Sequence, residues 1–237
     1  MSSARRDLGA QLELVRSGTA VFSKYLSSLT DEELGGATLL EGWSRKHLVG
    51  HVGFNARALM RLLDWAETGV ETPMYASTAQ REREIDAGAA LDCTALREMF
   101  DETAEQLDEK WRTTTRFDAL VRTAQGRMVP AITTVWMRNR EVWVHAVDLD
   151  NGLAFSDLPE PMLTLLLSDV IQVWRRRCVG EDIILQMPDA QPKPVGMRQE
   201  TITVHGTLPA VVQWATGRGA AGVHAEGGVL PTPPSWL

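Results

Sequence analysis

Hydrophobic residues recur at helical spacing through the first two thirds of the chain. Apolar positions three and four residues apart form one face of a helix, so this pattern predicts four long helices. They span about residues 4–28, 44–68, 94–111 and 130–151. Ser44 is a favourable N-cap for the second helix, and Asn151-Gly152 is a typical end for the fourth. Antiparallel helices of this length form a bundle, which can hold a metal ion between facing side chains.

Shorter connections join these predicted helices. Thr30-Asp-Glu-Glu33 fits a capping box, which indicates a short turn of helix. Pro73 and the polar residues 77–88 indicate a long connection that has room for a short helix. Pro130 begins the fourth predicted helix, because proline is favoured in a first helical turn.

The pattern changes after Gly152. An amphipathic helix is predicted first, and then a mixture of alternating, strand-like segments and one more helix. In chain order these are a helix at 158–177, strands at 183–187 and 200–205 joined by the connection 188–196, a helix at 208–216 and a strand within 222–229. We therefore predict an α+β protein with two domains, a four-helix bundle at residues 1–152 and a smaller α+β domain at residues 153–237.

Composition and charge exclude several classes of function. The chain has 237 residues, and 44% of them are hydrophobic, which is ordinary for a globular protein. Its net charge of −7 argues against nucleic acid as a partner, because phosphate binding needs a basic surface. No apolar run approaches the roughly 18 residues of a membrane span, and the N-terminal segment does not fit a secretory signal. We therefore expect a cytoplasmic protein, and a monomer, because no apolar stripe is left over.

The fourth predicted helix carries a metal-binding pattern. Glu141 and His145 are one helical turn apart and therefore project from the same face. Asp148 follows three residues later on that stripe, and its spacing fits the orientation of an imidazole only loosely. A third ligand must come from elsewhere, and His51 in the second helix lies among residues that are expected to be buried. Two histidines and one glutamate form a catalytic zinc ligand set with one open position.

Other interpretations of these polar residues stay open. A glutamate and a histidine one turn apart are more often a solvated surface pair, and a buried histidine is usually hydrogen-bonded within the core. The apolar surroundings of Trp136 and Trp143 favour the metal site, because polar groups there need a partner inside the protein. His47, one turn before His51, is a competing ligand. No recognisable metal or catalytic spacing surrounds the remaining histidines and cysteines, His205, His224, Cys93 and Cys178.

Several segments together resemble a known family. Residues 40–52 (LEGWSRKHLVGHV) are similar to the first metal motif of the DinB/YfiT-like helical bundles. The wider set resembles the mycothiol-dependent maleylpyruvate isomerases, and it adds 71–75 (ETPMY), 123–127 (TAQGR), 136–148 (WMRNREVWVHAVD), 217–219 (GRG) and 233–237 (PPSWL). The resemblance runs along essentially the whole chain and implies that the first domain is a DinB-like bundle.

The resemblance also implies a reaction and its site residues. Members of the family convert maleylpyruvate from gentisate breakdown into fumarylpyruvate, with mycothiol as a thiol cofactor. Zn²⁺ is then expected on His51, Glu141 and His145, and His47 is not expected to bind it. Arg218 is expected to act in catalysis, and its glycine neighbours would let a substrate carboxylate approach its guanidinium closely. Without the resemblance, an arginine in an exposed turn is an equally good interpretation.

A thiol explains how a double bond can be isomerised. Addition of a thiolate to the conjugated carbon leaves a single bond, rotation follows, and loss of the thiol gives the trans product. Zinc would either hold the sulfur as a thiolate or polarise the substrate carbonyl, and the sequence does not choose between these roles. A mycothiol S-transferase on the same scaffold is the alternative function, and a non-catalytic zinc- or thiol-binding module is a third.

Overall fold

The chain divides into two compact units. The computed structural model describes residues 3–236, so Met1, Ser2 and Leu237 of the patterns above lie outside the described residues. The first unit extends to Leu153 and the second begins at Ala154, one residue after the boundary expected from the sequence. The fold class is α+β, as predicted. Among residues 3–236, no helix combines the length and the apolar character that crossing a bilayer would require.

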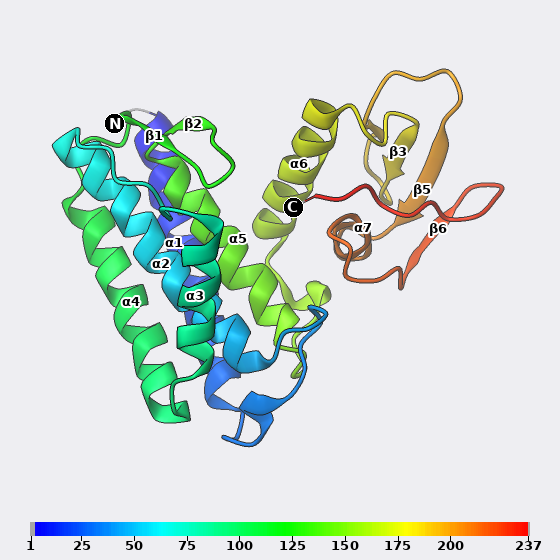
Figure 1. The fold of residues 1–237 in the computed structure, drawn as a ribbon. Helices are drawn as coiled ribbons and strands as arrows, with labels where there is room; N and C mark the ends of the chain where they lie inside the picture. Colours follow the sequence, from blue (N-terminus) through cyan, green and yellow to red (C-terminus); the bar gives the residue numbers. More distant parts are fainter. Residues whose placement is uncertain (1–2, 237) are drawn as a thin grey trace. The chain divides into compact units, whose positions relative to one another are not determined.

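Four of the described helices pack side by side in the first unit (Figure 1). They are α1 (Ser3–Ser27), α2 (Arg45–Thr68), α4 (Cys93–Thr113) and α5 (Thr133–Asp148). Both α4 and α5 pack against α1 and α2, which closes the bundle. Apolar side chains fill its interior, where Phe22 stacks on Phe100 with 4.7 Å between the ring centroids. The predicted four-helix bundle is therefore confirmed.

Local signals set the ends of these helices. Ser44 caps α2, because its hydroxyl oxygen accepts a hydrogen bond from the backbone N–H of His47. Gly69 ends the same helix in the left-handed conformation, with φ of +74°. The predicted capping box forms before the 3₁₀ turn η1 (Glu33–Gly35). The Thr30 N–H donates to the Glu33 carboxylate at 2.8 Å, and the Glu33 N–H donates to the Thr30 hydroxyl at 3.3 Å.

The polar segment predicted as a long connection is mostly helical. It forms α3 (Thr78–Ala89), a 12-residue helix capped by Ser77. This helix packs on α2, where Gly88 and Gly50 bring the two backbones together. A Cβ on Gly88 would lie 2.6 Å from the Cα of Gly50, so only glycine permits this approach.

The predicted start of the fourth helix was wrong. Pro130 does not open α5, which begins at Thr133. Instead it ends β2 (Met128–Pro130), which pairs with β1 (Leu120–Arg122) in an antiparallel hairpin. Strands of three residues are too short for an alternating pattern to be recognised, so the hairpin was not predicted.

The second unit is built on a small mixed sheet. Its elements are the 3₁₀ turn η2 (Phe155–Asp157), α6 (Glu160–Arg177), β3 (Ile183–Gln186), β4 (Lys193–Pro194), β5 (Ile202–Gly206), α7 (Leu208–Ala215) and β6 (Val223–Ala225). The strand order is β4-β3-β5-β6, with β3 and β5 parallel and the other neighbours antiparallel. α7 packs on α6 and on β5. The two predicted helices and three predicted strands are present, and the short β4 lies in the stretch predicted as a connection.

Tryptophan side chains hold the core of the second unit together. Trp174 of α6 and Trp214 of α7 are buried and meet edge to face, with 6.0 Å between their ring centroids. Their indole N–H groups donate to the backbone carbonyls of Pro234 and Pro231 at 3.0 and 3.2 Å. The indole N–H of Trp236 donates to a side-chain oxygen of Asp169 in α6 at 3.2 Å. Residues 231–236 are therefore tied to this core, and the side chain of Trp236 is buried in it.

Candidate metal centre

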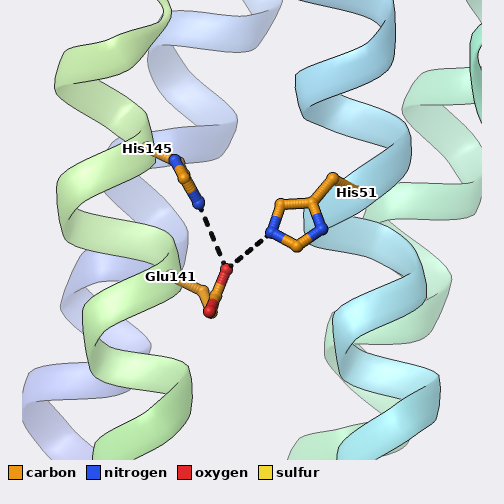
Figure 2. A group of neighbouring side chains, drawn as sticks. All are labelled: His51, Glu141 and His145. Carbon is orange, nitrogen blue, oxygen red and sulfur yellow. Dashed lines mark hydrogen bonds and ion pairs between the residues drawn. The ribbon is translucent and has the colours of Figure 1, made fainter. Parts of the chain in front are cut away.

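Two helices of the bundle bring the predicted metal ligands together. His51 lies in the second turn of α2, a position that the Ser44 cap fixes. Glu141 and His145 lie one turn apart on α5. The three side chains point toward one another between the helices (Figure 2). One ligand atom from each lies within 4.8 Å of the other two.

The glutamate carboxylate lies between the two imidazoles. Its Oε2 is 3.0 Å from Nε2 of His51 and 3.2 Å from Nε2 of His145 (Figure 2). The imidazole rings are 5.2 Å apart between centroids and nearly perpendicular, at 81°. Trp43 meets His51 edge to face at a centroid distance of 5.3 Å. Two nitrogens and one oxygen therefore face a common centre, beside an aromatic ring.

A buried carboxylate orients the second imidazole. Asp148 is completely buried, and its Oδ2 is 2.8 Å from Nδ1 of His145. Because an ionised carboxylate only accepts hydrogen bonds, this contact places a proton on Nδ1 and leaves Nε2 directed toward Glu141. The sequence spacing indicated this role only loosely, but the helix brings the two side chains into contact.

Burial and hydrogen bonds both act on the protonation of the cluster. Burial lowers the pKa of His51, although its hydrogen bond to Glu141 opposes this effect. Burial alone would raise the pKa of Glu141, but hydrogen bonds from His145 and His51 outweigh it and hold the pKa well below its usual value. Burial also lowers the pKa of His145, but Asp148 and Glu141 outweigh it and raise the pKa to about 9. Glu141 is therefore an anion at neutral pH and can attract a cation.

The donor set has the chemistry of a zinc site. Zinc in catalytic sites takes three protein ligands, often two histidines and a glutamate, and keeps one position open. The hydrogen bond from His145 to Asp148 is the carboxylate–histidine arrangement that accompanies metal-bound imidazoles. Metal ligation needs neutral imidazoles, so a proton on His145 must leave when an ion binds. The cluster can therefore hold a divalent metal and present an open position to a further ligand.

The other histidines and the cysteines lie outside this cluster. His47, the competing ligand in the sequence, has its Nδ1 2.6 Å from the hydroxyl of Ser44. Among residues 3–236, the group of side chains that could hold a metal ion does not include it. His205 and His224 lie opposite each other on β5 and β6, and their rings stack at 5.2 Å. Cys93 and Cys178 are free thiols.

Arg218 belongs to the second unit and lies in the turn after α7. Its flanking glycines, Gly217 and Gly219, have φ of +79° and +112°, values that favour glycine. The backbone N–H of Arg218 donates to the carbonyl of Gln213 at 2.9 Å, and the Gln213 amide donates back to the carbonyl of Arg218 at 3.0 Å. Arg218 is half-buried, and its guanidinium donates to the carbonyl of Thr216 at 2.7 Å. The turn is therefore ordered on both sides of the arginine.

Sequence reasoning missed one buried charge near the cluster. Arg138 lies one turn before Glu141 on α5 and is only 1% exposed. Its Nη1 donates to the backbone carbonyl of Val52 at 2.6 Å and to the side-chain oxygen of Asn55 at 3.2 Å. Both partners lie on α2, close to His51. The signal was legible, because an arginine three residues before Glu141 falls on the same helical stripe.

Comparisons with known proteins all point to the same family. The family model described as "Mycothiol maleylpyruvate isomerase N-terminal domain" matches residues 15–150. A solved structure of the mycothiol-dependent maleylpyruvate isomerase is 43% identical, with 97% of each chain covered and a TM-score of 0.93. A mutant of that protein, with alanine in place of one histidine, matches with the same identity and coverage and a TM-score of 0.92. None of the curated proteins matches the chain.

Proposed function

Because the chain belongs to the mycothiol-dependent maleylpyruvate isomerase family, we propose that it converts maleylpyruvate to fumarylpyruvate with mycothiol as its thiol cofactor. We further propose that the metal centre of His51, Glu141 and His145 binds zinc and is the site of this reaction. The product would be the trans isomer formed in gentisate degradation. The similarity to a solved isomerase through both units carries the proposal, and the convergence of the three side chains supports it.

The residues of the bundle would hold the metal and set its charge. Nε2 of His51, Nε2 of His145 and Oε2 of Glu141 are the donor atoms that face the common centre. Asp148 keeps the proton of His145 on Nδ1, so that Nε2 is free to bind the ion. When bound, zinc would supply a Lewis acid that keeps a coordinated thiol deprotonated at neutral pH. Mycothiol would supply the sulfur nucleophile for addition to the conjugated double bond.

Arg218 would recognise the substrate. Maleylpyruvate carries two carboxylates, and a guanidinium can bind a carboxylate through two parallel hydrogen bonds. The bonds of the turn to Gln213 and Thr216 hold Arg218 in place before the substrate arrives. There is open space beside Gly217, which leaves room for a ligand at that side of the turn.

The test is an isomerisation assay with purified protein, zinc and maleylpyruvate, with and without mycothiol. We expect fumarylpyruvate to form only when mycothiol is present, with many turnovers per thiol. An S-transferase would instead consume mycothiol in proportion to the substrate that disappears. The His51→Ala variant serves as the control for metal-independent reaction of the thiol. Absence of fumarylpyruvate with zinc-loaded protein and mycothiol would overturn the proposal.

A further inference from the structure

One stripe of α5 carries four polar side chains through the apolar interior of the bundle. Arg138, Glu141, His145 and Asp148 are separated by three, four and three residues, which places all of them on one face of the helix. Leaving histidine aside, the buried acidic and basic residues among those described are Arg138 (1% exposed) and Asp148 (0%). They flank the two metal-binding residues of this helix, one on each side.

Arg138 joins the two helices that carry the metal ligands. Its Nη1 donates hydrogen bonds to the carbonyl of Val52, the residue after His51, and to the side-chain oxygen of Asn55, one turn further along α2. The guanidinium therefore holds α2 against α5 at a point that lies within one helical turn of His51 on α2 and of Glu141 on α5. Removal of this side chain would loosen the position of His51 relative to the other ligands.

The positive charge of Arg138 has no direct counter-ion. Its Nη2 is buried without a hydrogen-bond partner, and within residues 3–236 no carboxylate lies within ion-pair distance of its guanidinium. Burial lowers the pKa of Arg138 to about 10, and the negative charge of Glu141 opposes the fall, so the side chain stays cationic at pH 7. An unpaired buried cation is costly, which calls for a compensating role.

The charges around the centre indicate what that role is. With both histidines neutral, the carboxylates of Glu141 and Asp148 balance a divalent metal ion. The charge of Arg138 then leaves the buried centre with one net positive charge. An anionic ligand at the open position would bring this sum to zero, whereas a neutral ligand would not. Arg81 on α3 adds positive charge, but it is half-buried and water screens it more strongly.

We propose that Arg138 positions the metal centre for an anionic ligand, because its hydrogen bonds hold α2 against α5 and its charge favours an anion over a neutral molecule at the open position. For the thiol cofactor this means that the thiolate is preferred to the neutral thiol. That last step rests on the proposed function, whereas the preference for anions does not. Arg138 is a positioning residue, since it acts through the metal centre rather than on the substrate.

The test measures ligand binding to the cobalt-substituted protein, whose visible spectrum changes when a ligand occupies the open position. The probes are thiocyanate as a simple anion, imidazole as a neutral ligand, and mycothiol. Arg138→Gln removes the charge and retains a hydrogen-bond donor, and Arg138→Lys retains the charge. We expect Arg138→Gln to lose about 10- to 100-fold in affinity for thiocyanate and mycothiol, with imidazole affinity nearly unchanged. Arg138→Lys should lose less than about tenfold for each anion.

The matched control is Trp111→Phe. This change removes a buried hydrogen bond to α5, from Trp111 Nε1 to the Thr134 hydroxyl at 3.0 Å, without a change of charge. The affinities of Trp111→Phe for thiocyanate, imidazole and mycothiol should equal those of the parent protein. Equal losses for thiocyanate and imidazole in Arg138→Gln would show a merely structural role and overturn the proposal, as would no loss at all. If Arg138→Gln does not fold, a tenfold or larger loss of thiocyanate affinity in Arg138→Lys overturns it.

The mycothiol arm separates this inference from the proposed function. If the parent protein binds thiocyanate in an Arg138-dependent manner but does not bind mycothiol, the function is wrong and the role of Arg138 stands. If mycothiol binds equally well to the parent and to Arg138→Gln, the function stands and the role of Arg138 is wrong.

Discussion

The metal cluster and the turn around Arg218 acquire their order in different ways. In the bundle, two long helices fix His51, Glu141 and His145, and each position follows from helical spacing and a capped start. In the second unit, Arg218 lies in a short turn between α7 and β6, held by backbone carbonyls and two glycines in the left-handed region. The cluster is thus determined by periodic structure, whereas the turn is determined by local hydrogen bonds.

The difference matches what each group is proposed to bind, a metal ion in the cluster and a substrate carboxylate at the turn. Metal ligation requires donor atoms fixed to within about half an ångström, which rigid helices provide. A substrate carboxylate arrives from solvent and needs a cation with free space beside it, which a turn with glycines provides. We therefore expect changes in the cluster to remove the metal and changes in the turn to affect catalysis alone.

Replacement of a metal ligand should have the largest effect. His51→Ala, Glu141→Ala and His145→Ala each remove one of three donors, and we expect loss of bound zinc together with activity. Since a metal ion contributes several kcal/mol to transition-state stabilisation, activity should fall at least about 10²- to 10³-fold. Metal analysis and the isomerase assay on the same preparation check this. A variant with full zinc content and normal turnover would remove its residue from the site.

Replacement of Arg218 should separate catalysis from metal binding. Arg218→Ala deletes the guanidinium outside the cluster, so zinc content should remain that of the parent while kcat/KM falls about 10²-fold. Arg198 is a matched control, because it is another arginine of the second unit and its ion pair with Glu181, at 3.4 Å, is exposed. Arg198→Ala should retain both zinc and activity. If Arg218→Ala turns over at the parent rate, the carboxylate role must be abandoned.

A smaller effect is expected from the carboxylate behind the ligands. Asp148→Asn keeps the shape of the side chain but loses the charge that holds the proton on Nδ1 of His145. Zinc affinity should fall about 10- to 100-fold, measured by competition with a chelator. Asp150→Asn, two residues further along and exposed, should leave zinc affinity unchanged. Equal affinities for Asp148→Asn and the parent would show that this contact does not support the metal.

The smallest effect should come from the packing of α3 on α2. Gly88→Ala places a Cβ 2.6 Å from the Cα of Gly50, the neighbour of His51, so the helices must separate. We expect the free energy of unfolding to fall by about 1–3 kcal/mol, measured by denaturant titration. Gly9→Ala in α1 is the control, because its Cβ meets nothing within 4 Å. That change should stabilise the protein by up to about 1 kcal/mol. A Gly88→Ala variant as stable as the parent would show that α2 and α3 can separate at Gly50 and Gly88 without loss of stability.

Helix patterns explain how much of the bundle could be predicted. α1, α2 and α4 have long apolar stripes and caps such as Ser44, so their ends fell within a residue or two of the prediction. α3 was harder to recognise, because it buries only Ile85 and Gly88 and its other residues are polar or small. In such a helix the signal comes from contact with α2, which a sequence pattern does not contain. The parallel pairing of β3 with β5, which are separated by β4 in the chain, likewise depends on contacts that a sequence pattern does not contain.

The candidate site was predicted in part for the same reason. Spacing along one helix related Glu141 to His145. Their meeting with His51, 90 residues before Glu141, requires α2 and α5 to lie side by side. Periodicity does not give that pairing, and the resemblance supplied it. Arg138 was overlooked because an arginine in a helix is usually expected at the surface, whereas here it is 1% exposed.

The tryptophan contacts of residues 231–236 have a consequence for biosynthesis. Every part of the bundle lies before Ala154, so its core can be completed while the ribosome is still translating the remainder. The core of the second unit cannot be completed so early. The carbonyls that accept hydrogen bonds from the indole N–H groups of Trp174 and Trp214 belong to Pro234 and Pro231, which are synthesised near the end of the chain. We therefore expect nascent chains that stop before Pro231 to carry a protease-resistant bundle followed by a segment that is still open to cleavage.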